Sequence, residues 1–458
     1  MNPLTGSLKF LSSTLFNSLL AFLFFLIAGH FTSPEFVGKV AIIQLMETIA
    51  GTFFMLLPGN LITREITDKF SNKENYQNII YTSLTYSLLI SPIFLILLFF
   101  PNYLYYSIPY FILFVYTSYQ GNILSGLGKF TEVNIGNIIF TIARWGLSII
   151  AIFYHSIILL IIIWTLGSLI KLIYYHLFIP FKFELDIKIA KEIIKVGLPI
   201  YLSGIISFIS SQGDRLITAF LLGSYYLGIY QLVSLISIVP SLLIGSLSSP
   251  LLPTSVYYNK KGIDYYTMSS LTLRLLTLLS IILGIIGFII VPYFLQIFFP
   301  KYILGLEALK ILFLSLTLTI PLQILSVFLI SAKKNYKIFI IIGSISALEV
   351  VTLSYILIPL YNITGAAIAQ FSNIITTSLL YIYYSYKQGI LKLNEKEILS
   401  VILIFFSFLS YLNPFIILIL VLILIKLLKI INKEDIKIIE KFSPDKLRFI
   451  NRILYLFS

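Results

Sequence analysis

The sequence predicts an all-α membrane protein with about fourteen transmembrane helices. The first observation is composition: 59% of the 458 residues are hydrophobic and only 11% are charged, whereas a soluble domain carries about 25% charged residues. The second is a mean hydropathy of +0.99. The third is a series of apolar runs, most of them long enough to cross a bilayer core of about 30 Å. So few charges cannot cover a water-soluble surface, so a string of soluble domains is excluded.

Apolar runs bounded by Gly, Pro or charged residues give fourteen spans in chain order. Residues 15–28 resemble the core of a signal peptide, but no small-residue cleavage site follows, so we interpret them as part of the first span. The thirteenth span is the shortest. The predicted spans are 8–29, 36–58, 78–100, 104–125, 133–154, 157–178, 196–222, 227–252, 268–291, 303–331, 337–358, 363–385, 398–411 and 414–431.

The distribution of Lys and Arg predicts the orientation of these spans. With the N-terminus inside, the inside loops and the C-terminal tail hold 24 of the 32 basic residues, and the outside loops hold only Lys39 and Lys301. Cytoplasmic loops are enriched in Lys and Arg, so we expect a multi-pass protein of the cell membrane with both termini in the cytoplasm. The net charge of +13 then reflects topology, and no nucleic-acid partner is expected.

Several classes of chemistry have no support in the sequence. The chain has no cysteine, so it has no disulfide, thiolate nucleophile or Cys-ligated metal. Its three histidines, His30, His155 and His176, show no metal-ligand spacing. Every predicted loop is short, and no G-x-x-x-x-G-K-[ST] phosphate loop occurs. We therefore expect neither an enzyme, nor a metal, nor a bound cofactor; coupling to H⁺ or Na⁺ is left open.

A weak internal repeat predicts the domain organisation. HFTSPEFVGKVAIIQL (30–45) parallels FLLGSYYLGIYQLVSL (220–235), with Gly38 and Gly228 in matching hairpins. Six spans separate the copies, so both halves share one orientation, as in transporters with a substrate site between two lobes. The expected parts are 1–178, an N-lobe of spans 1–6; 179–195, a cytoplasmic linker helix; 196–385, a C-lobe of spans 7–12; 386–431, spans 13 and 14; and 432–458, a cytoplasmic amphipathic basic tail.

The fifth span carries a polar stripe. A charge at bilayer depth costs about 2.5–3.5 kcal/mol on insertion scales, so each such charge needs a reason. Arg144 lies ten residues beyond Asn134, which places it about 15 Å into the bilayer. Asn137, Thr141 and Ser148 share its face within about 80°. Two interpretations stay open: Arg144 faces a substrate cavity together with Asn137 and Thr141, or it is the structural partner of a carboxylate.

The seventh span has a second polar face, around Asp214. It is formed by Ser203, Ser207, Ser210, Asp214 and Thr218. Ser207 and Ser210 are candidates for lining the cavity. Asp214 is either a cavity-lining or ion-coupling carboxylate or one half of an internal ion pair, and Arg215 lies 100° further round the helix.

Five further charged residues complete the candidates. Glu47 and Glu349 are the other deep acids and are candidates for binding H⁺ or Na⁺. Lys171 and Arg274 lie within two turns of cytoplasmic ends, where such side chains reach toward the interface or offset substrate charge. Arg64 follows the second span at the inner surface, where it could meet an anionic headgroup. A cavity lined by Arg, Ser, Asn and Gln suits a substrate with phosphate and hydroxyl groups.

Five stretches in order make the sequence similar to a known family. They are SPEFVG (33–38), PGNLITREI (58–66), GLPIYLSGIISFISSQGDRLITAFLLGSYYLGIY (197–230), LLP (251–253) and IPLYNITGAAIA (358–369). Over about 8–431 the chain resembles the polysaccharide-transport branch of the multidrug/oligosaccharidyl-lipid/polysaccharide exporter superfamily, the lipid-linked oligosaccharide (O-antigen type) flippases. Asp214 and Arg215 match the Asp-Arg of its Pro…Asp-Arg…Leu-Gly…Leu-Gly-x-Tyr pattern.

The resemblance implies fourteen helices, in two six-helix lobes plus two, and alternating access between the lobes. It implies a glycan linked to polyprenyl (undecaprenyl or dolichyl) phosphate or pyrophosphate as cargo, with membrane lipids and glycan-assembly proteins as partners. Arg144, Arg215, Lys171 and Arg274 would then offset the phosphate charge. Two alternatives are a cation-coupled exporter of drugs or small metabolites from the same superfamily and a membrane glycan enzyme. The exporter should favour acids and aromatics in its cavity, and the enzyme should carry a large polar loop.

Overall fold

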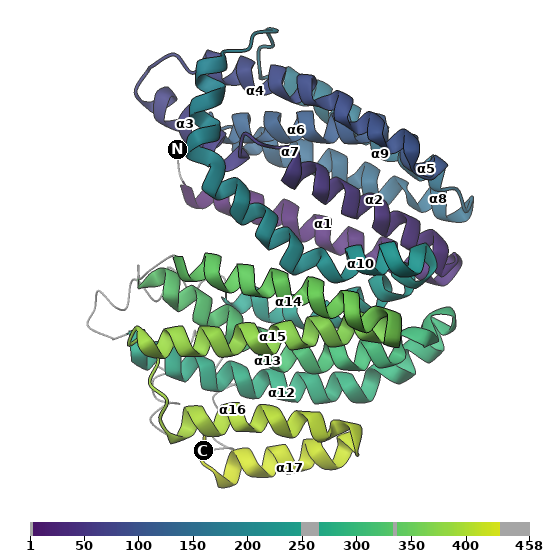
Figure 1. Ribbon diagram of the computed structural model, residues 1–458, viewed down its shortest axis with the longest axis vertical. Coiled ribbons are helices and arrows are strands. Elements are labelled where there is room, and N and C mark those ends of the chain that lie inside the picture. Colours follow the sequence, from purple (N-terminus) through teal and green to yellow (C-terminus); the bar gives the residue numbers. More distant parts are fainter. Residues whose placement is uncertain (1–2, 249–264, 333–336, 431–458) are drawn as a thin grey trace. The chain divides into compact units, whose positions relative to one another are not determined.

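The computed structural model describes residues 3–248, 265–332 and 337–430 (Figure 1). Within these ranges the regular structure is helical and no strand occurs, so the predicted all-α class is confirmed. In the same ranges, nine helical stretches are long and apolar enough to cross a membrane on their own. The tail expected at 432–458 and the LLP stretch (251–253) lie outside the described residues.

Each predicted span coincides with helix over most of its length. The elements are α1 (Pro3–Phe31), α2 (Pro34–Phe53), α3 (Gly59–Ser71), α4 (Gln77–Ile90), η1 (Ser91–Phe99), α5 (Asn102–Tyr105), α6 (Ile108–Gly126), α7 (Phe130–Thr141), η2 (Ile142–Leu147), α8 (Ile149–Phe153), α9 (Ile157–His176), α10 (Ile187–Ser248), α12 (Tyr265–Phe298), η3 (Pro300–Gly305), α13 (Leu306–Ser331), α14 (Lys337–Tyr361), α15 (Ile363–Lys387), α16 (Glu395–Phe408), η4 (Leu409–Tyr411) and α17 (Pro414–Leu427). Helix α3 is an addition, because 59–77 was expected to be a loop.

The start of α2 follows from three consecutive residues. Ser33 is the N-cap, and its hydroxyl accepts a hydrogen bond from the backbone N–H of Phe36. Pro34 occupies the first turn, where its missing N–H would have no partner in any case. Glu35 adds a negative charge, which the positive end of the helix dipole favours. The SPE sequence therefore fixes where α2 begins.

Helix α10 consists of two helices, 187–222 and 224–248. Gly223 separates them, with φ +77° and ψ −173°, a conformation that a residue with a β-carbon rarely adopts. The two parts correspond to spans 7 and 8. Of the segment 179–195, expected to be a short surface helix, residues 180–186 are non-helical and 187–195 form the first turns of α10.

The chain divides into two compact units, Met1–Leu232 and Val233–Ser458. The boundary falls within span 8, so the N-terminal unit contains span 7 as well as spans 1–6, and the two six-helix lobes stay a prediction. The core of the N-terminal unit is aromatic, and its largest buried side chains include Phe24, Tyr110 and Trp164.

In the C-terminal unit, α13 packs on α12 and α15, while α16 and α17 pack on α12. A cluster of buried aliphatic side chains joins these last two helices to α12; it includes Ile281, Ile285, Leu403, Val421 and Ile425. Spans 13 and 14 therefore belong to the core of this unit.

Two glycines bring α2 and the second part of α10 into backbone contact. A β-carbon added to Gly38 would lie 1.7 Å from the carbonyl oxygen of Ser224, and one added to Gly228 would lie 1.8 Å from the carbonyl oxygen of Pro34. Real β-carbons never approach so closely. The two glycines that the internal repeat matched thus pack against each other within the N-terminal unit.

We expect Gly38→Ala and Gly228→Ala each to destabilise the protein by about 1–3 kcal/mol, the usual cost of overpacking. Thermal unfolding of the purified protein in detergent checks this. The matched control is Gly204→Ala on α10, where an added β-carbon meets no atom within 4 Å. Because alanine favours helix by about 0.5–1 kcal/mol over glycine, this control should unfold at the wild-type temperature or above. If Gly38→Ala unfolded at the same temperature as the wild type, that result would contradict the tight contact.

Candidate functional site

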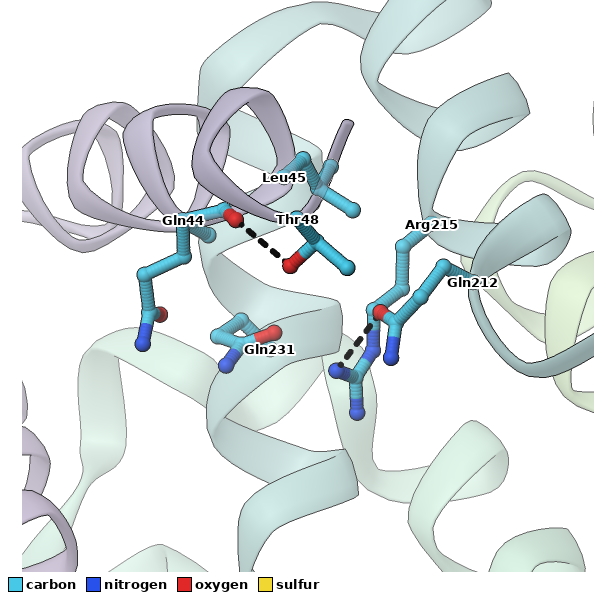
Figure 2. A pocket seen from close by; sticks show the side chains of 7 residues that line it. Gln44, Leu45, Thr48, Gln212, Arg215 and Gln231 are labelled. Carbon is cyan, nitrogen blue, oxygen red and sulfur yellow. Dashed lines mark hydrogen bonds between the residues drawn. The ribbon is translucent and has the colours of Figure 1, made fainter. Parts of the chain in front are cut away.

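A polar cavity of about 160 Å³ lies in the N-terminal unit between α2 and the two parts of α10 (Figure 2). Helix α2 contributes four residues and α10 the other three. The lining residues are Ala41, Gln44, Leu45, Thr48, Gln212, Arg215 and Gln231. We call this space the arginine cavity.

Arg215 is the cation of this cavity. Its Nη1 donates a hydrogen bond of 3.2 Å to Oε1 of Gln212. Among the described residues its guanidinium forms no ion pair, in contrast to Arg144 and Arg274, which pair with carboxylates. A guanidinium carries five N–H donors, so Arg215 retains N–H groups that can donate hydrogen bonds to a ligand oxygen.

Three glutamines surround the same space. Figure 2 shows the side chains of Gln44, Gln212 and Gln231 around the cavity that Arg215 enters. Gln231 is only 7% exposed, and the buried Oε1 of Gln44 has no hydrogen-bond partner within the described ranges. A primary amide both donates and accepts, and an unpaired buried polar group is costly. These amides are therefore suited to hydroxyl and acylamino groups of a ligand.

Asp214 is not among the residues that line the arginine cavity. It is 4% exposed, and its carboxylate accepts hydrogen bonds from the hydroxyl of Tyr230, at 2.6 Å, and the backbone N–H of Arg215, at 2.8 Å. It forms no ion pair with any residue the structure describes. The bond to Tyr230 ties the two parts of α10 together across the break at Gly223. A role for Asp214 in binding H⁺ or Na⁺ stays a prediction.

Arg144 forms a buried ion pair with Glu47. Its Nη1 donates to Oε1 at 2.9 Å and its Nη2 to Oε2 at 2.5 Å, while the hydroxyl of Tyr110 donates to Oε2 at 2.8 Å. The rings of Trp145 and Trp164 lie 4.6 Å from the guanidinium carbon. This is the geometry of a structural partner for a carboxylate. A role for Arg144 in substrate binding, or for Glu47 in ion coupling, stays a prediction and would require this pair to open.

Two other polar residues of the fifth span, Asn137 and Thr141, also have partners inside the N-terminal unit. Asn137 accepts a hydrogen bond from Tyr175, at 3.4 Å, and Thr141 donates to Asn17, at 3.2 Å. Arg144 itself lies on the π-helical turn η2, a feature that frequently marks functional sites in helices. Asn137 and Thr141 do not line the arginine cavity.

Of the remaining basic candidates, Lys171 lies over the rings of Phe140 and Tyr175, at 5.5 and 5.4 Å from their centroids. Arg64 is exposed on α3. Arg274 belongs to the C-terminal unit, where its Nε lies 3.1 Å from Oε1 of Glu397. These three residues do not line the arginine cavity, and their roles in substrate binding stay predictions.

Glu349 and the two serines complete the predicted set. Glu349 accepts a hydrogen bond of 3.0 Å from Thr376 in the C-terminal unit, and its second oxygen is buried without a partner in the described part of the chain. Ser207 is exposed on α10, and Ser210 donates to its backbone carbonyl at 3.5 Å. Over the described ranges no group of three or more His, Cys, Asp and Glu is placed to hold a metal ion.

Of the predicted site residues, Arg215 alone lines the arginine cavity. A lining that includes glutamine was expected, but Gln44, Gln212 and Gln231 were not among the candidate residues. One local signal was present, because Gln212 and Arg215 are three residues apart and therefore neighbours on the helix surface. Helical spacing could not reveal that Gln231 lies beside Arg215. It follows the break at Gly223, so its position depends on how the two parts of α10 fold back on each other.

Comparison with known proteins identifies the family. The family model described as "Polysaccharide biosynthesis protein" matches residues 4–259, which is more than half of the chain. The chain belongs to this family. Its fold is similar to that of the lipid II flippase MurJ in an inward closed conformation, with a TM-score of 0.66, 17% sequence identity, and 90% of this chain and 96% of that chain covered.

Two MATE structures share the fold less closely. A MATE mutant has a TM-score of 0.55 and 14% identity, covering 85% of this chain and 97% of that chain. A mutant of the Vibrio cholerae MATE transporter VcmN has a TM-score of 0.51 and 12% identity, covering 84% and 95%. No curated protein matched the sequence. This member of the polysaccharide biosynthesis family is thus a multi-pass membrane protein with a MurJ- and MATE-like transporter fold, and the predicted resemblance is confirmed.

Proposed function

We propose that this protein is a flippase that moves a glycan linked to polyprenyl phosphate or pyrophosphate from the inner to the outer leaflet, for the assembly of a polysaccharide or glycoconjugate. The observation that carries the proposal is Arg215, which has no ion pair with any described residue and enters a polar cavity between three glutamines. Membership of the polysaccharide biosynthesis family supports a glycan as part of the cargo.

The chemistry of the arginine cavity fits both parts of such a headgroup. A guanidinium binds two phosphate oxygens through parallel hydrogen bonds and is weakly hydrated, so it retains this ability in a partly dry site. The amides of Gln44, Gln212 and Gln231 offer donors and acceptors to sugar hydroxyls. The undecaprenyl or dolichyl chain stays in the lipid. A cationic drug would instead meet the positive charge of Arg215.

The proposed mechanism is alternating access. With both termini in the cytoplasm, the headgroup enters from the inner leaflet, Arg215 offsets its phosphate charge, and a conformational change exposes it to the other side. Asp214, Glu47 and Glu349 are the candidates for coupling this cycle to H⁺ or Na⁺. A gradient supplies about 2.3 kcal/mol per charge per 100 mV of membrane potential. Proteins that assemble the glycan would supply and use the cargo.

Translocation in proteoliposomes tests the proposal. A fluorescent polyprenyl-pyrophosphate oligosaccharide is placed in one leaflet, and its arrival in the other is followed with a membrane-impermeant quencher. We expect transfer only in vesicles that contain the protein, with protein-free vesicles and vesicles holding an unrelated membrane protein as controls. Absence of transfer, together with uptake of a small organic cation, would instead support the exporter alternative. Repeating the assay with imposed H⁺ and Na⁺ gradients tests the coupling.

A further inference from the structure

A second, larger cavity of about 290 Å³ lies in the same N-terminal unit. It is formed by the C-terminal end of α2, the start of α3, one residue of α6 and the first part of α10. Its lining residues are Gly51, Thr52, Met55, Pro58, Gly59, Asn60, Asn122, Ile200, Tyr201 and Gly204. We call it the neutral cavity, because none of these residues is charged.

The walls of the neutral cavity combine hydrogen-bonding groups with flat surfaces. Thr52, Asn60 and Asn122 offer hydroxyl and amide groups. Tyr201 adds an aromatic ring, held in place because its hydroxyl donates a hydrogen bond of 2.9 Å to the backbone carbonyl of Phe53. A phosphate would find no cation among these residues, and a polyprenyl chain would leave their polar groups unpaired. A neutral, hydroxyl-rich ligand needs no cation and forms hydrogen bonds with these polar groups.

The two cavities lie next to each other along α2 and α10. On α2, Thr48 lines the arginine cavity and Thr52 the neutral cavity, four residues or about 6 Å apart along the helix. On α10 the corresponding residues are Gln212 and Gly204, eight residues or about 12 Å apart along the helix. One ligand that carries a phosphate and several sugars can therefore reach both cavities.

An exposed face of α10 joins the two cavities. At 100° per residue, Gly204, Ser207, Ser211 and Arg215 fall within an arc of about 80°. The first three of these residues are exposed. The two serines therefore present hydroxyl groups between the glycine of one cavity and the cation of the other.

We propose that the neutral cavity is the sugar subsite of the transporter: it binds uncharged sugars of the glycan while Arg215 binds the phosphate. This assignment rests on the proposed function and extends it. The transporter therefore recognises two parts of one headgroup at separate places. Only a glycan long enough to reach past the arginine cavity uses the second one.

Gly204 allows a test that leaves the fold intact. A β-carbon at this position meets no atom within 4 Å, so a larger side chain can begin there without displacing a neighbouring atom. We expect Gly204→Trp to slow translocation of a polyprenyl-pyrophosphate oligosaccharide by about tenfold, a difference of 1.4 kcal/mol. The same variant should translocate the corresponding monosaccharide carrier at the wild-type rate. Leu202→Trp places the same large side chain at an exposed residue of α10 that lines neither cavity; it is the matched control and should transport both.

Each other result has a defined meaning. If the wild type translocates neither carrier, the proposed function fails. If the wild type translocates both and Gly204→Trp slows neither, or slows both equally with unchanged thermal unfolding, the sugar subsite is wrong and the flippase proposal stands. Should Gly204→Trp fail to fold, Thr52→Val provides the test, because it removes one hydroxyl at nearly constant volume. It should slow only the oligosaccharide carrier, and equal rates for both carriers would overturn the assignment.

Discussion

Arg215→Ala is expected to slow translocation of the lipid-linked oligosaccharide by roughly 10- to 150-fold. Hydrogen bonds to charged groups contribute about 1.5–3 kcal/mol, and this substitution removes the only cation of the arginine cavity. Protein stability should change little, since the Arg215 side chain forms one described hydrogen bond, to Gln212. Initial rates in proteoliposomes containing equal amounts of protein measure the effect.

Two further variants separate the geometry of the guanidinium from its charge. Arg215→Lys keeps the charge but loses the planar pair of donors, so its translocation rate should lie between those of Arg215→Ala and the wild type. Lys188→Ala removes an exposed charge from the first turn of the same helix, away from both cavities, and should keep the wild-type rate. A wild-type rate for Arg215→Ala would place the transport path elsewhere.

Glu47→Leu is expected to destabilise the protein by about 3–5 kcal/mol. The substitution leaves Arg144 buried without its carboxylate, and an uncompensated buried charge has a cost of this size. Replacing both partners, as Glu47→Leu with Arg144→Met, should recover much of the loss, because hydrophobic residues of similar volume commonly substitute for a buried ion pair.

The molecule supplies its own probe for this experiment. The chain contains two tryptophans, and both rings lie 4.6 Å from the Arg144 guanidinium carbon. Tryptophan fluorescence during thermal unfolding therefore reports on the surroundings of the ion pair. Equal unfolding temperatures for Glu47→Leu and wild type would show that the pair does not stabilise the fold. A stable double variant that no longer translocates glycan would instead assign the Arg144–Glu47 pair a role in transport.

The helices could be predicted because each membrane-spanning helix appears in the sequence as a long run of apolar residues. Each apolar run had to satisfy its backbone hydrogen bonds within itself, so spans such as 157–178 and 337–358 coincide with α9 and α14. Helix α3 was missed, since 59–77 is polar and has no run of apolar residues. The sequence also placed the break between spans 7 and 8 correctly to within a few residues, because Gly223 and Ser224 interrupt the apolar pattern.

The candidate site was only partly predictable. Arg215 stood out as a charge within an apolar helix, but the pairing of Arg144 with Glu47 depends on how α2 packs against the fifth span, and helical periodicity carries no information on that packing. The glutamines of the arginine cavity were missed because uncharged amides do not stand out. The neutral cavity was missed because part of its wall is formed by glycines, which have no side chain to mark a site in the sequence.

The contact between Gly38 and Gly228 also bears on how fast the molecule can rearrange. Helices joined by interlocking side chains must change rotamers before they separate, since packed interiors leave no free space. Here the approach is between backbone atoms, with the carbonyl oxygens of Pro34 and Ser224 in place of side chains. Such a surface is smooth, and the individual attractions across it are weak and short in range. Parting α2 from the second part of α10 at this point requires no side chain to leave a pocket, so we expect a rearrangement there to have a low kinetic barrier.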